Sequence, residues 1–223
     1  MITVHHLNNS RSQRVLWLLE EIGCDYTIEK YMRDAETMRA PASLKAVHPL
    51  GKSPVITDGD ITVAESGAIV EYLVDTYAPA LKPEAGTAAH RAYVYWLHFS
   101  EGSAMPPMLI RLVVDQIGKA KMPFFAKPIA KSIVARLRAF VDPEIDNIFA
   151  YIEDVLGQSD WLAGDTFTAA DIQMSFPLEA ASARAGITPK SHPNIHAWLD
   201  RIHARPAYAQ ALEKGGEYGI LGG

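Results

Sequence analysis

The first 78 residues alternate between short strand patterns and amphipathic helix patterns. Residues 2–7 are typical of a strand, a helical pattern begins near Ser12 and ends at Gly23, and residues 26–31 alternate as a second strand. A strand, a helix and another strand in such close succession predict a parallel βαβ unit with a right-handed crossover.

A second pair of strands follows residues 32–48, which carry only weak helical character. Residues 55–57 and 61–63 flank an Asp-Gly pair, the signal of a tight hairpin. A helix then starts at Ser66 and ends near Tyr77, with apolar positions at helical spacing. This order predicts a small four-stranded α/β module.

Beyond this module the pattern predicts helices alone. Residues 79–86 are rich in Pro, Ala and Gly and are typical of a linker. We therefore expect domains at 1–78 and 87–223. In the second domain we expect a helix over 87–102, a kink or interruption at Pro106-Pro107, and a loop or broken helix over 118–128. A long helix over 129–156, bent at Pro143, should follow, and then a capping box at Thr168–Asp171. The last expected elements are helices over 193–204 and 206–214 and a loosely held tail from Gly215.

A proline stands directly before the third strand. Proline cannot donate to a sheet ladder, so it is tolerated at strand starts and edges. The Ser53-Pro54 bond is a candidate for the cis form, which an X–Pro bond adopts far more readily than other bonds. Ser53 would then offer its backbone N–H and C=O to an extended ligand, as a sheet edge does.

Charge and composition exclude several classes of partner. The net charge of −5 over 223 residues argues against non-specific nucleic-acid binding, which needs a basic face. No apolar run approaches the ~20 residues of a membrane span, and the N-terminus lacks a signal-peptide pattern. The single cysteine, Cys24, fits a reducing compartment, so we expect a cytoplasmic protein. We expect no metal site, because no zinc-ligand spacing is present and His5 and His6 point to opposite faces of a strand.

Four motifs occur in order along the chain. They are Ser10-Arg11-Ser12-Gln13-Arg14-Val15, His48-Pro49-Leu50-Gly51-Lys52-Ser53-Pro54-Val55, Glu65-Ser66, and Phe167-Thr168-Ala169-Ala170-Asp171-Ile172. With them, the chain resembles the cytosolic glutathione transferases over nearly its whole length. The resemblance implies a thioredoxin-like N-terminal domain, an all-helical C-terminal domain, glutathione as co-substrate, a role in detoxification, and a homodimer in which the α/β module of one subunit meets the helical domain of the other.

The resemblance also assigns roles in binding glutathione. It places the cysteinyl backbone of the tripeptide against Ser53 and Pro54, with Lys52 supplying charge or a donor. Glu65 and Ser66 would hold the γ-glutamyl end, since N–H groups at a helix start favour a carboxylate. On position alone Ser66 is equally a plain helix N-cap, and the two roles are compatible.

The first turn would carry the chemistry. Members of the family use a tyrosine, serine or cysteine here, and this turn offers Asn9, Ser10 and Ser12 instead of a tyrosine or cysteine. Alignment on Arg14-Val15 makes Ser10 the expected activating residue, although Ser12 could be only the helix N-cap and Asn9 could donate its amide to sulfur. A free thiol has a pKa of ~8.5, and lowering it by about two units needs roughly 2.7 kcal/mol.

The resulting functional hypothesis is a glutathione transferase that directs the thiolate at an electrophilic carbon of an apolar compound. One alternative is a glutathione-dependent peroxidase or disulfide reductase, and another is a non-catalytic adaptor with the same fold. Without a cysteine in the turn, a mixed disulfide with the enzyme is disfavoured. Phe99, Met105 and Met108 are candidates for the second-substrate pocket, or are ordinary core.

Overall fold

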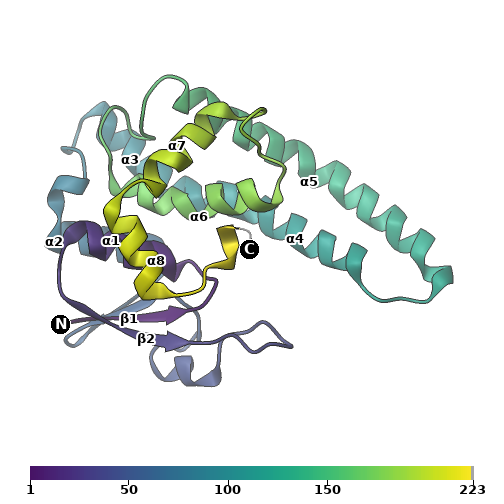
Figure 1. Cartoon of the computed structure of the whole chain (residues 1–223), viewed down its shortest axis with the longest axis horizontal. Helices are drawn as coiled ribbons and strands as arrows, with labels where there is room; N and C mark the ends of the chain where they lie inside the picture. The colour runs from purple at the N-terminus through teal and green to yellow at the C-terminus, as the bar shows by residue number, and fades with distance from the viewer. Residues whose placement is uncertain (222–223) are drawn as a thin grey trace.

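The computed structural model describes residues 1–221, in which a sheet-containing N-terminal part is followed by helices (Figure 1). This confirms the predicted fold class, an α/β thioredoxin-like domain followed by an all-α domain. The elements are β1 Ile2–Leu7, α1 Ser12–Ile22, β2 Tyr26–Tyr31, η1 Ala42–Ala46, β3 Val55–Asp58, β4 Ile61–Ala64, α2 Ser66–Tyr77, η2 Pro79–Leu81, α3 Ala88–Phe99, η3 Ser100–Ala104, α4 Met105–Lys119, η4 Phe124–Ala126, α5 Lys127–Leu156, α6 Ala169–Arg184, α7 Pro193–His203, α8 Pro206–Gly215 and η5 Gly219–Leu221.

The sheet has the strand order β2-β1-β3-β4. β1 pairs with β2 in parallel, with Ile2 opposite Tyr26 and Leu7 opposite Tyr31, and the β3–β4 hairpin adds to it antiparallel. Because β1 lies between two other strands, all of its residues except Thr3 are buried. That position explains why its sequence shows only partial alternation.

Helix α6 forms the centre of the helical part. Every residue from Ala169 to Ala181 is buried. The predicted capping box is confirmed, and its Asp171 carboxylate accepts from the backbone N–H groups of Thr168 and Leu162, each at 3.0 Å, and from the Trp198 indole at 3.1 Å. A shorter Asp replaces the usual Glu because this carboxylate also serves two groups beyond its own helix.

The helices over residues 88–156 differ from the prediction. Helix α3 ends at Phe99, and the π-helical turn η3 then leads directly into α4. Pro106 and Pro107 therefore lie in the first turn of α4, where a missing N–H costs nothing, and they do not break the helix. Helix α4 also continues to Lys119, and α5 begins at Lys127, so less of 118–128 is irregular than expected.

The expectation of a loosely held tail is wrong for residues 215–221. The Tyr218 hydroxyl donates to Glu179 on α6 at 2.9 Å, and the Gly219 N–H donates to the Asn9 side-chain oxygen at 2.6 Å. Ile220 is buried against Phe176. These contacts dock the tail beside the first turn, while residues 222–223 lie outside the described part of the chain.

The connection between α2 and α3 contains the short helix η2. The domain boundaries at 78 and 87 stay a prediction. Within residues 1–221, no helix combines the length and apolar character that crossing a bilayer demands.

Candidate functional site

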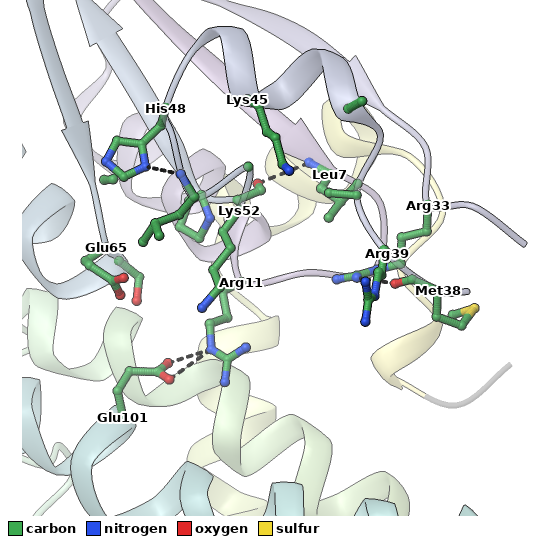
Figure 2. A pocket seen from close by; sticks show the side chains of 18 of the residues that line it. Leu7, Arg11, Arg33, Met38, Arg39, Lys45, His48, Lys52, Glu65 and Glu101 are labelled. Atoms are coloured by element: carbon green, nitrogen blue, oxygen red, sulfur yellow. Dashed lines mark hydrogen bonds and ion pairs between the residues drawn. The ribbon is translucent and has the colours of Figure 1, made fainter. Parts of the chain in front are cut away.

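A cavity of about 890 Å³ lies where the α/β part meets the helical part (Figure 2). Five of the predicted site residues line it, namely Lys52, Ser53, Pro54, Glu65 and Ser66. The other three, Asn9, Ser10 and Ser12, are not among its lining residues. The structure therefore brings the predicted backbone-binding and carboxylate-binding groups together but sets the first-turn candidates apart from them.

Ser53 is fixed by its side chain. Its hydroxyl donates to the His5 carbonyl at 2.8 Å and accepts from the Leu7 N–H at 3.3 Å, which anchors the loop to β1. The Ser53-Pro54 bond is cis, as predicted. Since the hydroxyl is occupied, the main chain of Ser53 is the part that a ligand in the cavity can use.

The O–H group of Ser66 has no acceptor among the described residues. Ser66 is the first residue of α2, and its oxygen accepts from the Arg14 guanidinium at 2.8 Å and from the Gln173 amide at 3.3 Å. A hydroxyl has two acceptor lone pairs and one O–H. Because Arg14 and Gln173 use both lone pairs, the O–H can donate to an acceptor in the cavity, next to the positive end of the α2 dipole. The N-cap position itself falls on Glu65, not on Ser66.

Within residues 1–221, three residues other than glycine have left-handed backbone conformations, and two of them line the cavity. They are Glu65 with φ of 72°, Met38 with φ of 57° and Asn9 with φ of 50°. Glu65 and Met38 line the cavity. Such conformations cost of order 1–3 kcal/mol for residues with a Cβ, and they concentrate at ligand sites.

The guanidinium of Arg14 connects the cavity to the helical part. It is buried and donates to Ser66, to the Ser100 hydroxyl at 3.2 Å, to the Gln173 carbonyl and to Glu101. Burial of the Glu101 carboxyl favours a higher pKa, but the charges of Arg14 and Arg11 outweigh it and hold the Glu101 pKa below its usual value. The sequence analysis did not assign a role to these residues. Arg14 stands four residues before the buried Leu18 and so lies on the apolar face of α1, and a charged residue on that face is a signal that could have identified it.

The hydroxyls of the first turn are buried, are hydrogen-bonded to each other, and are not among the groups that line the cavity. Burial, helped by the Lys30 charge, lowers the pKa of His6 to about 4, so its imidazole is neutral at neutral pH. Its Nδ1 forms a hydrogen bond with Ser12 Oγ at 2.9 Å. Ser12 Oγ also donates to the Leu7 carbonyl at 3.3 Å, and it forms a hydrogen bond with Ser10 Oγ at 2.7 Å.

The remaining candidates occupy other surroundings. The Asn9 side-chain oxygen accepts from the tail, as described above. Ser12 is the first residue of α1, so the N-cap position falls on Arg11 and the alternative of Ser12 as the N-cap is wrong. Met105 and Met108 pack in the apolar cluster around Phe176, and Phe99 stacks among aromatic residues of α3 and α5. None of these three lines the cavity, whose apolar contribution from α4 is Leu109.

Comparison with known proteins decides the family. Residues 1–75 match the glutathione S-transferase N-terminal domain, and residues 113–206 match the glutathione S-transferase C-terminal domain. The chain is 39% identical to Glutathione S-transferase 3 of Schizosaccharomyces pombe over 216 residues, which cover 96% of this chain and 88% of that protein. The chain belongs to the glutathione S-transferase family.

Two further similarities agree with this family. Glutathione S-transferase 1 of Saccharomyces cerevisiae is 34% identical, over 96% of this chain and 95% of that protein. A crystal structure of a glutathione S-transferase from Actinobacillus pleuropneumoniae has a TM-score of 0.81 at 34% identity, covering 100% of this chain and 95% of that chain. The family predicted from the four sequence motifs is thereby confirmed.

The cations of the cavity are the main feature that the motifs did not predict. Arg11, in the turn before α1, donates from Nε to both carboxylate oxygens of Glu101 at 2.9 Å. Arg33, Arg39 and Lys45 also line the cavity, on the side away from Glu65 (Figure 2). In a glutathione S-transferase, such a distribution suits a ligand with carboxylates at both ends. Within residues 1–221, no three metal-ligating side chains gather into a group.

The buried imidazole of His6 makes the stability of this family member depend on pH. Its pKa lies at about 4 when folded and near 6.5 when unfolded, so the unfolded chain alone binds this proton as the pH falls between those values. The neutral imidazole of His6 makes its full contribution to the free energy of unfolding above pH ~6.5. As the pH falls from there to about 4, the free energy of unfolding should decrease by about 1.4 kcal/mol per pH unit.

We expect His6→Gln to remove this slope in denaturant unfolding measured across the same pH range. His98→Gln, which changes an exposed histidine of α3, serves as the matched control and should keep the wild-type slope. Equal slopes for wild type and His6→Gln would show that the imidazole is not held neutral by the fold.

Proposed function

We propose that this enzyme binds glutathione in the cavity, stabilises its thiolate and directs it at an electrophilic carbon of a largely apolar second substrate. The observation that carries this proposal is that Ser66 Oγ accepts hydrogen bonds from Arg14 and Gln173, which leaves its O–H group able to donate to a ligand. A donor held in that orientation at a helix N-terminus matches the carboxylate of a γ-glutamyl group.

The charges along the cavity fit the whole tripeptide. The γ-glutamyl end carries a carboxylate and an ammonium, which we assign to Ser66 and to the Glu65 carboxylate. The Ser53 main chain pairs with the cysteinyl residue, in the manner of an added strand. The glycine carboxylate then lies toward Arg39 and Lys45, with Lys52 between the two ends.

Chemistry on the thiol of bound glutathione is favoured over chemistry on an enzyme thiol. Cys24 follows α1 and does not line the cavity, and burial raises the pKa of its thiol. A disulfide-exchange route through the enzyme therefore has no support from the site. We assign the protein to the detoxification of apolar electrophiles in the cytoplasm, where glutathione is kept reduced.

Removal of the Ser66 hydroxyl tests this proposal. A hydrogen bond to a charged group contributes about 1.5–3 kcal/mol, so Ser66→Ala should weaken glutathione binding by roughly ten- to a hundredfold in calorimetric titration. The kcat/KM for conjugation of an aryl halide should fall in parallel.

Two further variants separate binding from folding. Ser132→Ala makes the same change on the exposed surface of α5 and should bind glutathione like wild type. Glu65→Gln acts on the same end of the ligand without touching Arg14 and should also weaken binding. Unchanged affinity in both Ser66→Ala and Glu65→Gln would mean that the γ-glutamyl end lies elsewhere.

We further propose a homodimer, supported by an apolar surface on the α4–α5 hairpin. The two helices run antiparallel and project beyond the other helices (Figure 1). Ion pairs of Arg111 with Asp142 and of Arg138 with Asp115 link them on one flank. Helical spacing places a row of exposed apolar side chains on the opposite flank and tip, called the hairpin face here: Ile110, Val113, Ile117, Phe124, Phe125, Ile129, Ile133, Leu137 and Phe140.

The hairpin face is large enough for a subunit interface. Its three phenylalanines are 68–83% exposed, which alone leaves roughly 450 Å² of apolar surface at ~200 Å² per ring. Six aliphatic side chains add to this area. The largest apolar patch of a monomer is typically ~300–600 Å², whereas each partner of a standard interface covers ~800 Å².

A charge placed on the hairpin face should therefore separate the subunits. We expect sedimentation of wild type to give twice the chain mass, and Phe140→Asp to give the mass of a single chain. Ala135→Asp introduces the same charge on the opposite flank of α5 and should leave the dimer intact. A monomeric wild type, or dimers of both variants, would contradict the assignment.

A further inference from the structure

The first turn leaves open which group stabilises the thiolate. Ser10 and Ser12 are buried, and their hydroxyls are hydrogen-bonded to each other at 2.7 Å, with Ser12 bonded in turn to His6 and the Leu7 carbonyl. Ser10 Oγ also accepts from the Ser12 N–H at 3.2 Å. A thiolate in the cavity needs a donor that faces it, and neither Ser10 nor Ser12 is among the residues that line the cavity.

The side chain of Arg11 lies in the cavity itself. Figure 2 shows it reaching from the first turn into the space between Glu101 and Lys52. Only its Nε takes part in the hydrogen bonds to Glu101, so among the described residues its two terminal nitrogens have no hydrogen-bonding partner. The guanidinium also lies 5.0 Å from the centre of the Phe176 ring, which supports it from the side of α6.

The charges around this turn favour an anion. Arg11, Arg14 and Arg33 lie close enough to disfavour one another's charge, since Arg11 contributes to lowering the pKa values of the other two, after burial as the main cause. Glu101 is the carboxylate that contacts Arg11 and Arg14. The guanidinium of Arg33 donates to the backbone carbonyls of residues 8, 9 and 38. The other charged groups facing the cavity here are Lys52 and Glu65.

We propose that the terminal nitrogens of Arg11 donate to the sulfur of bound glutathione and stabilise its thiolate. This inference rests on the proposed binding of glutathione. The S–H bond breaks and its proton passes to solvent, while Arg11 stays protonated throughout. The sulfur lone pair then forms the C–S bond to the electrophile, and the leaving group departs with its bonding electron pair. Glu101 orients Arg11 through Nε and is a positioning residue.

The test is a pH titration of the ultraviolet absorbance of the bound thiolate in wild type and Arg11→Met. We expect the apparent pKa of bound glutathione to rise by about one to two units in Arg11→Met, which is a ten- to hundredfold loss of thiolate below that pKa. Arg11→Lys keeps the charge and should give an intermediate value. Arg184→Met, a matched change at an exposed arginine of α6, should titrate like wild type.

A sulfur-free analogue distinguishes a role at sulfur from a role in folding. Glutathione with alanine in place of cysteine should bind Arg11→Met within about twofold of wild type, because the analogue offers Arg11 nothing to contact. If its affinity falls as far as that of glutathione, Arg11 positions the tripeptide and the inference is wrong.

The remaining outcomes separate a failure of this inference from a failure of the proposed function. A pKa shift in Ser10→Ala or Asn9→Ala, with none in Arg11→Met, would overturn the inference and leave the proposed function in place. A wild type that binds neither glutathione nor the analogue would overturn the proposed function itself.

Discussion

The buried guanidinium of Arg14 is the interaction on which the site depends. A charge removed from water costs several kcal/mol unless it is paired and hydrogen-bonded. Arg14 obtains its partners from α2, η3 and α6, which are Ser66, Ser100, Glu101 and the Gln173 carbonyl. This cost is offset only when the α/β part and the helical part are docked against each other. The same docking orients Ser66 and Glu101 toward the cavity, so the stability of the domain contact and the geometry of the site have one source.

The turn η3 shows how the fold serves this arrangement. A π-helical turn inserts extra residues into the path from α3 to α4, and such turns are frequent at functional sites. Ser100 and Glu101, the first two residues of this turn, both reach Arg14. The Glu101 carboxylate also accepts hydrogen bonds from Nε of Arg11. The left-handed backbone of Glu65 on the opposite wall is a second local cost that the site imposes on the fold.

The sequence predicted those features whose causes are local. The parallel βαβ unit, the β3–β4 hairpin, the cis Ser53-Pro54 bond, the capping box and the cluster of Lys52, Glu65 and Ser66 all follow from short motifs. Failures occurred where the cause lies far away in the chain. The tail is held by Asn9, which is 210 residues from Gly219, and by Glu179, which is 39 residues from Tyr218. Such long-range docking leaves no periodic trace in a sequence, so the glycine-rich composition of the tail could not reveal that it is held in place.

The most direct test of this account is a crystal structure of the protein with bound glutathione. The account predicts the γ-glutamyl carboxylate on the Ser66 hydroxyl, the cysteinyl backbone paired with Ser53, and the sulfur within hydrogen-bond distance of the terminal nitrogens of Arg11. Sulfur on Ser10 Oγ or on the Asn9 amide would contradict the assignment of the thiolate. A γ-glutamyl group bound away from Ser66 would contradict the central role given to Arg14 and its partners.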